Sequence, residues 1–90
     1  METGVHIVVK GMVQGVGFRY FVRDRASRLG LNGIVQNKYD GSVTIDVEGD
    51  RSLIEELIKD VKTGPRFADV TDMLVEWKCF ENRYHSFDIY

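Results

Sequence analysis

The chain has 90 residues, of which 14 are acidic and 12 are basic, and its net charge is −2. We expect residues 1–90 to form a single domain, because a chain of this length forms one domain at most, and a hydrophobic fraction of 43% is ordinary for a globular protein. The small acidic excess argues against a dedicated nucleic-acid-binding protein, and the longest apolar run, residues 7–9, is far too short to span a membrane.

Apolar residues occupy every second position from Val5 to Val9, which predicts a strand with a buried face that ends near Lys10. The next segment, residues 11–17, holds three glycines and is predicted to be a loop. Apolar residues then recur at spacings of three and four over residues 18–29, which is typical of an amphipathic helix. Gly30 follows at the position expected of a helix C-cap.

The middle of the chain predicts a β-hairpin. Residues 33–37 form the first expected strand, and the Asp40-Gly41 pair is typical of a tight turn. Apolar and polar residues alternate over residues 42–48, which is the clearest pattern of a half-buried strand in this chain. These two strands are therefore expected to pair with each other.

A second helix is expected after the hairpin. Ser52 and Glu55 have the spacing of a capping box, and apolar residues at helical spacing follow them. Two further strands are expected over residues 70–80 and 87–90. Cys79 falls within the first of them and is interpreted as a small, buried, apolar side chain.

The predicted order of elements is strand, helix, strand, strand, helix, strand, with a short strand at the end. Two helices cannot cover both faces of a sheet of four or five strands, so the favoured packing has two layers. We therefore predict an α+β sandwich, in which an antiparallel sheet carries both helices on one face. This is the ferredoxin-like βαββαβ arrangement. His6 alternates with core positions and is interpreted as a residue of the sheet surface.

The segment between the first strand and the first helix carries the clearest chemical signal: Gln14-Gly15-Val16-Gly17-Phe18-Arg19. Glycines let consecutive N–H groups point into one concavity, and a helix N-terminus adds free donors, so the segment predicts an anion site suited to a phosphoryl group. Arg19 opposes the helix dipole unless an anion lies between it and the amides. The alternative is a glycine-rich connector with a surface arginine, because neither the P-loop pattern nor the dinucleotide-binding fingerprint is present.

Asn37 is the second candidate residue, at the end of the strand that precedes the turn. On its own, an asparagine here is more typical of a turn residue that bonds its own backbone. The functional alternative is an amide that both donates and accepts hydrogen bonds and so holds a water molecule.

Three segments together resemble the two signature segments of the acylphosphatase family: Val13-Gln14-Gly15-Val16-Gly17-Phe18-Arg19, then Gly33-Ile34-Val35-Gln36-Asn37 and Asp40-Gly41-Ser42-Val43. The resemblance covers nearly the whole chain and implies one acylphosphatase-like domain over residues 1–90 with a ferredoxin-like fold. It implies an enzyme that hydrolyses the carboxyl–phosphate bond of small-molecule acyl phosphates by direct attack of water.

The resemblance also implies roles for individual residues. Arg19 is expected to bind the phosphoryl group with the amides of residues 14–19, and Asn37 to position the attacking water. Neither a metal nor another cofactor is implied, and inorganic phosphate is expected as the product and as a competitive inhibitor. Two positions depart from the family's usual pattern: Ile34 stands where tryptophan is common, and Lys38 stands where a small or apolar residue is frequent. The first bears on packing, and the second on how the site opens or which acyl group it prefers.

Two other functions remain open from the residues alone. One is a non-catalytic module that binds an anion or carbamoyl phosphate, and the other is an RNA-binding domain on the same fold.

No signal peptide is evident, and the single cysteine cannot form an internal disulfide, so a cytoplasmic location is expected. No Cys/His spacing suits a metal, and we expect a monomer without nucleic-acid or membrane partners.

Overall fold

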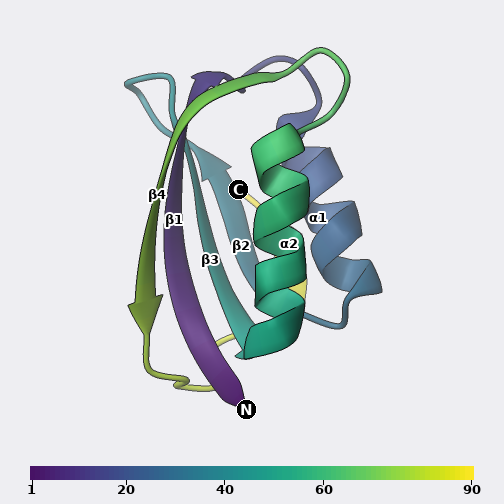
Figure 1. Ribbon diagram of the computed structural model, residues 1–90, viewed down its shortest axis with the longest axis vertical. Coiled ribbons are helices and arrows are strands. Elements are labelled where there is room, and N and C mark those ends of the chain that lie inside the picture. The colour runs from purple at the N-terminus through teal and green to yellow at the C-terminus, as the bar shows by residue number, and fades with distance from the viewer.

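The helices and strands follow the predicted order. The computed structural model describes residues 1–90, and its elements are β1 (Glu2–Met12), α1 (Phe18–Arg28), β2 (Asn32–Asn37), β3 (Val43–Asp50), α2 (Arg51–Thr63), β4 (Asp69–Lys78) and β5 (Phe87–Ile89). The five strands form one sheet in the order β4-β1-β3-β2-β5. Both helices cover the same face of this sheet (Figure 1). The ferredoxin-like two-layer sandwich expected from the sequence is confirmed.

The sheet is mixed because its last strand runs parallel to its neighbour. β1 pairs antiparallel with β3 and β4, and β2 pairs antiparallel with β3 as the predicted hairpin requires. β5 instead pairs parallel with β2, from Gly33 opposite Phe87 to Val35 opposite Ile89. The expected antiparallel pairing thus holds for the first four strands, and the structure differs from it at the short edge strand β5.

The core lies between the helices and the covered face of the sheet. Alternate residues of the two central strands are buried there, as the period of two in the sequence predicts. The helices contribute one buried residue in each turn, and each fully buried side chain of this size stabilises the fold by roughly 1.5–3 kcal/mol. The main contributors are Val5, Ile7, Val9, Val43, Ile45 and Val47 from the sheet and Phe18, Val22, Ile54, Leu57 and Val61 from the helices. Neither helix has the length and apolar character needed to cross a membrane.

The second helix begins two residues earlier than the predicted capping box places it. Asp50 is the N-cap, with extended backbone at φ −65° and ψ 131°, and its side chain accepts a hydrogen bond from the Ser52 N–H at 2.9 Å. Ser52 lies inside the first turn and also donates its hydroxyl proton to Asp50. The prediction that Ser52 and Glu55 cap the helix is therefore wrong, because aspartate already fills the capping position.

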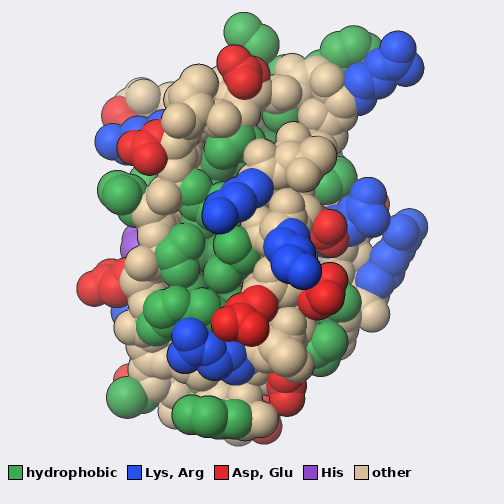
Figure 2. All heavy atoms as spheres, viewed as in Figure 1, with side chains coloured by type: hydrophobic (Ala, Val, Ile, Leu, Met, Phe, Trp, Pro, Cys, Tyr) green, Lys and Arg blue, Asp and Glu red, His purple; other side chains and the backbone are tan.

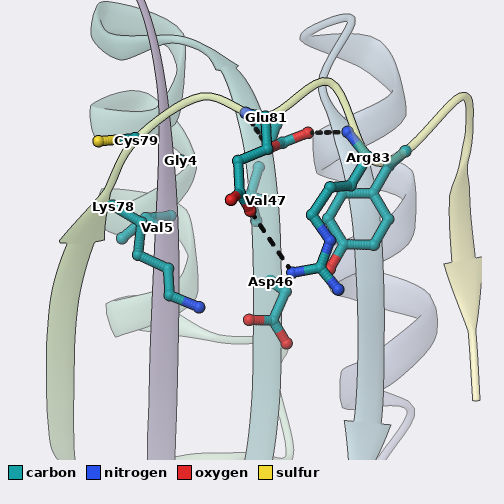
Figure 3. A pocket seen from close by; sticks show the side chains of 10 residues that line it. Gly4, Val5, Asp46, Val47, Lys78, Cys79, Glu81 and Arg83 are labelled. Atoms are coloured by element: carbon teal, nitrogen blue, oxygen red, sulfur yellow. Dashed lines mark hydrogen bonds and ion pairs between the residues drawn. The ribbon is translucent and has the colours of Figure 1, made fainter.

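β4 and β5 lie at opposite edges of the sheet, so residues 79–86 must cross it to connect them (Figure 3). Glu48 of β3 is buried and holds this crossing segment: its two carboxylate oxygens accept the N–H groups of Glu81 and Arg83, both at 2.7 Å. The cavity beside it has a volume of about 20 Å³, which is room for a single water molecule. Cys79 is exposed, so the prediction that it is buried is wrong; β4 ends at Lys78 and the chain turns away.

The other face of the sheet carries no helix. His6 lies there, half-buried, with its Nδ1 atom 2.7 Å from an Asp46 carboxylate oxygen on the neighbouring strand β3. The interpretation of His6 as a residue of the sheet surface is confirmed.

The core is least completely covered at the β4 edge. Val75 lies opposite the fully buried Ile7 and yet is 39% exposed. Figure 2 shows hydrophobic side chains at the surface between β4 and α2. The guanidinium group of Arg51 covers part of this edge, because it lies 4.1 Å from the ring centroid of the half-buried Trp77.

Candidate active site

The loop between β1 and α1 has the backbone that its sequence predicts. Gly15 and Gly17 adopt left-handed conformations with φ of 74° and 75°, which residues with a side chain rarely adopt. Gly17 is the N-cap of α1 and offers no side chain to cap it, and no acidic residue stands in the first turn. The first N–H groups of α1 are therefore left for an acceptor from outside the helix, and the helix dipole favours an anion there.

Gln14 fixes this loop to the turn between β2 and β3. Its amide nitrogen donates hydrogen bonds to the main-chain oxygens of Lys38 and Ser42, at 2.8 and 2.9 Å. The sequence predicts Gln14 as part of the phosphate-binding loop. In the structure its side chain does not line the phosphate-binding segment's hollow but links the glycine segment, through these two hydrogen bonds, to the turn beside Asn37.

The turn that follows Asn37 is closed by its own side chains. An Asp40 carboxylate oxygen accepts both the main-chain N–H and the hydroxyl proton of Ser42, at 2.9 and 2.6 Å. The hydrogen bond from the Ser42 hydroxyl holds the pKa of Asp40 below its usual value, so the carboxyl is ionised at neutral pH. Asn37 pairs with Val43 across this turn, its side chain is exposed, and its amide forms no hydrogen bond within the chain.

Arg19 lies in the first turn of α1 and its position is fixed from outside the helix. Its Nη1 atom donates a hydrogen bond to the main-chain oxygen of Tyr90 at 2.8 Å. Tyr90 itself is held against β2, because its N–H donates to the main-chain oxygen of Val35 at 2.8 Å. The parallel pairing of β5 with β2 therefore brings Tyr90 to Arg19.

Arg19 and Asn37 line one hollow of about 180 Å³, together with Gly15 and Gly17. We call it the phosphate hollow. Arg19 is its only charged side chain, and Val13, Phe18 and Tyr20 complete its wall. Two candidate residues that the sequence separates by a helix and most of a strand thus meet at one end of the sheet.

The apolar residues of the predicted loop anchor it to the core. Val16 is half-buried and packs against the core, and Phe18 is buried in it as well as lining the hollow. Ser42, Tyr20 and Tyr90 also belong to the site and were not predicted as site residues. The Asp-Gly-Ser order of the turn was a usable signal for Ser42, whereas nothing local to Tyr90 indicates its contact with Arg19. No three side chains of His, Cys, Asp or Glu are placed to hold a metal ion together.

Known proteins resemble this chain over its full length. The family model described as Acylphosphatase matches residues 5–89. An acylphosphatase of Caldanaerobacter subterraneus subsp. tengcongensis is 44% identical over 90 residues, which is 100% of both chains. The crystal structure of acylphosphatase from Bacillus subtilis superposes with a TM-score of 0.94 at 40% identity and covers 100% of this chain and 99% of that one. Full-length HypF in its phosphate- and nucleotide-bound form matches with a TM-score of 0.87 at 31% identity, over 12% of its length.

Proposed function

The chain belongs to the acylphosphatase family, and from that membership we propose how its site hydrolyses an acyl phosphate. The protein is an acylphosphatase enzyme, whose substrates are small-molecule acyl phosphates. In the proposal, Arg19 and the amides of the Gly15–Arg19 segment bind the phosphoryl group. Asn37 binds the attacking water and orients it toward phosphorus.

The proposed reaction is a single in-line displacement. The water oxygen forms a bond to phosphorus while the bond from phosphorus to the acyl oxygen breaks. The acyl group leaves as a carboxylate, and the proton lost by the water is released with inorganic phosphate or to solvent. A carboxylate with a pKa of roughly 4 is a good leaving group, so the step needs little help from a general acid. Charge spreads over the three equatorial oxygens of the phosphoryl group in the transition state.

The protein's part in this step is positioning and electrostatic stabilisation. A guanidinium group offers two parallel N–H donors to phosphate oxygens, and its hydrogen bond to Tyr90 already restricts where the Arg19 side chain lies. The Asn37 side-chain amide can accept a hydrogen bond from the water through its oxygen or donate one to it through its nitrogen. Its lack of a partner within the chain leaves both groups available.

One observation carries the proposal: Arg19, Asn37 and the two left-handed glycines line the same hollow at the uncapped N-terminus of α1. We further propose that the domain acts as a monomer and without a metal ion, and that inorganic phosphate inhibits it competitively. We also propose that the protein works in the cytoplasm, where a reducing environment suits its one exposed, free cysteine.

The test is hydrolysis of benzoyl phosphate, with EDTA present, by the wild type, Arg19→Gln and Arg23→Gln. Arg23 is the matched control, because it lies on the same helix and pairs with Asp24 outside the hollow. Removing a donor aimed at transition-state charge costs about 10²–10³-fold in rate, so we expect that loss for Arg19→Gln and near-normal turnover for Arg23→Gln.

Circular dichroism must show that all three proteins are folded. Normal turnover by folded Arg19→Gln would refute the role given to Arg19. A folded wild type that binds phosphate and hydrolyses nothing would instead support the alternative, a non-catalytic module that binds an anion or carbamoyl phosphate.

A further inference from the structure

A second hollow adjoins the phosphate hollow and shares Asn37 with it. It has a volume of about 580 Å³ and is lined by Gln14, Gln36, Asn37, Lys38 and Tyr39. We call it the acyl hollow, because an acyl phosphate bound through Arg19 must extend its acyl group out of the phosphate hollow. The shared residue, Asn37, marks where the two hollows meet, and so the direction in which the substrate can extend.

The two hollows have the same distribution of charge. Each is lined by a single cationic side chain, Arg19 in the phosphate hollow and Lys38 in the acyl hollow, and neither is lined by a carboxylate. Two cationic hollows that meet at one residue complement a ligand with an anionic group at both ends. We propose that Lys38 makes this enzyme selective for acyl phosphates whose acyl group carries a second negative charge. This inference rests on the proposed function, because it takes the phosphoryl group to lie at Arg19.

The main chain of Lys38 is held firmly, while its side chain is free. Its N–H donates to the main-chain oxygen of Ser42 at 2.8 Å, and its own main-chain oxygen accepts from Gln14 at 2.8 Å and from the Gly41 N–H at 3.1 Å. The side chain is exposed and takes part in none of the ion pairs of the structure. The ammonium group therefore starts from a fixed point beside the substrate with its charge unpaired.

The nearest carboxylate in sequence does not compete for this ammonium group. Asp40 accepts two hydrogen bonds from Ser42 and lines a separate hollow together with Lys10. Lysine presents a compact charge on a flexible stem, so it selects for negative charge without demanding one fixed geometry. The selected class is accordingly defined by charge, and a terminal carboxylate satisfies it.

Two rigid substrates test the proposal: 4-carboxybenzoyl phosphate, which carries the second charge, and 4-carbamoylbenzoyl phosphate, which has nearly the same shape without it. The measured quantity is the ratio of their kcat/KM values. Intrinsic differences in leaving-group reactivity cancel when this ratio is compared between variants. In Lys38→Gln we expect the ratio to fall by about two- to fivefold, the size of effect that an exposed ion pair produces. Lys38→Glu should lower it further.

Lys10→Gln is the matched control, because it removes the same charge from the neighbouring hollow. We expect its ratio to equal that of the wild type. Added salt should lower the wild-type ratio and leave the Lys38→Gln ratio almost unchanged, since salt screens exposed charges.

Three outcomes would overturn the inference. An unchanged ratio in Lys38→Gln, with both substrates turned over, would remove Lys38 as the determinant and leave the proposed function intact. An equal fall in Lys10→Gln would show that the general field of the surface acts instead of the acyl hollow. Normal turnover in the parallel Arg19→Gln variant would refute the role given to Arg19, and the inference that rests on it.

Discussion

Asn37 shows how little side-chain chemistry the proposed site needs. The residue ends β2, its amide is exposed, and the braced turn from Lys38 to Ser42 fixes its backbone. The proposal assigns most of the phosphate binding to Arg19 and to main-chain N–H groups, whose positions follow from the loop geometry. Asn37 is the one lining side chain with an amide group, so orientation of the water depends on it.

Asn37→Ala should therefore lower kcat far more than it weakens binding of phosphate. We expect kcat for benzoyl phosphate to fall about hundredfold, because the water loses its orientation. The inhibition constant of inorganic phosphate, which Arg19 and the amides set, should stay within about twofold of the wild type. Asn32→Ala, at the other end of the same strand, is the control. A weaker phosphate affinity with unchanged kcat would show that Asn37 binds the phosphoryl group instead.

The candidate site residues that the structure brings together are those whose signal in the sequence is local. The Gly15-Val16-Gly17 segment, Arg19 and Asn37 each lie within a short pattern whose conformation neighbouring residues determine. The Arg19–Tyr90 contact could not be predicted, because it depends on a parallel strand that forms 71 residues further along the chain. The cap of α2 was missed for a different reason: aspartate and serine are both good N-caps, and Asp50 and Ser52 stand two residues apart.

The N-terminus of α2 is capped by a side chain, whereas that of α1 is not. The first arrangement stabilises the fold, and the second leaves N–H groups available for a ligand. Asp50 accepts hydrogen bonds at the N-terminus of α2. The N-terminus of α1 has neither a side-chain cap nor an acidic residue, and it carries the cation Arg19. An open N-terminus is a stability cost in the free protein. A phosphoryl group bound there supplies the missing acceptor, so α1 should gain stability when the site is filled.

Phosphate-dependent stability is accordingly expected of α1, and α2 contributes a pH-dependent part of the stability. Hydrogen bonds from the Ser52 hydroxyl, the N-terminal amino group and the Ser52 N–H lower the pKa of Asp50 from 3.8 to about 2. Because the folded-state pKa is depressed, the stability that Asp50 contributes is full above pH 3.8 and is lost as the pH falls through about 2.

The variant Asp50→Asn tests this, because asparagine keeps the helix cap and removes the charge. Urea unfolding should show the variant less stable than the wild type at pH 6, with the difference shrinking progressively toward pH 2. A difference that is the same at both pH values would contradict this account.

For the molecule as a whole, strand order decides how the site is completed. The edges of the sheet are β4 and β5, so the chain must cross the full width of the sheet near its end. Glu48 provides the polar acceptors that this crossing needs, from the helix-free face that it shares with Asp46 two residues earlier on β3. β5 can then reach β2 and place Tyr90 beside Arg19.

Glu48→Ala should lower the free energy of unfolding by about 3 kcal/mol, because it removes two hydrogen bonds that the charged carboxylate accepts, each worth about 1.5 kcal/mol or more. Glu76→Ala is the control: its side chain is exposed on β4, and exposed substitutions of this kind change stability by at most about 0.5 kcal/mol. Chemical unfolding measures both. Below the unfolding transition, hydrolysis of benzoyl phosphate by Glu48→Ala should stay within about twofold of the wild type, since Tyr90 keeps its bond to Val35. A Glu48→Ala variant as stable as the wild type would show that the hydrogen bonds to Glu48 do not stabilise the crossing segment.

The two-layer architecture followed from the sequence because its elements have clear periods. Alternation over residues 43–47 and helical spacing over residues 18–29 each define one buried face, and the layers follow from covering those faces. The direction of β5 and the exposure of Cys79 did not follow. A strand of three residues has too few positions to show a pattern, and Cys79 lies where the chain leaves β4 for a crossing that only the finished sheet defines.

The contact between Arg19 and Tyr90 also makes hydrolysis a reporter of the edge strand β5. Tyr90 directly follows this strand and is held against β2 by its N–H, so Arg19 has this contact only when β5 is paired with β2. On the proposed mechanism, activity therefore reports a strand of three residues that contributes almost nothing to the circular dichroism signal of the whole sheet.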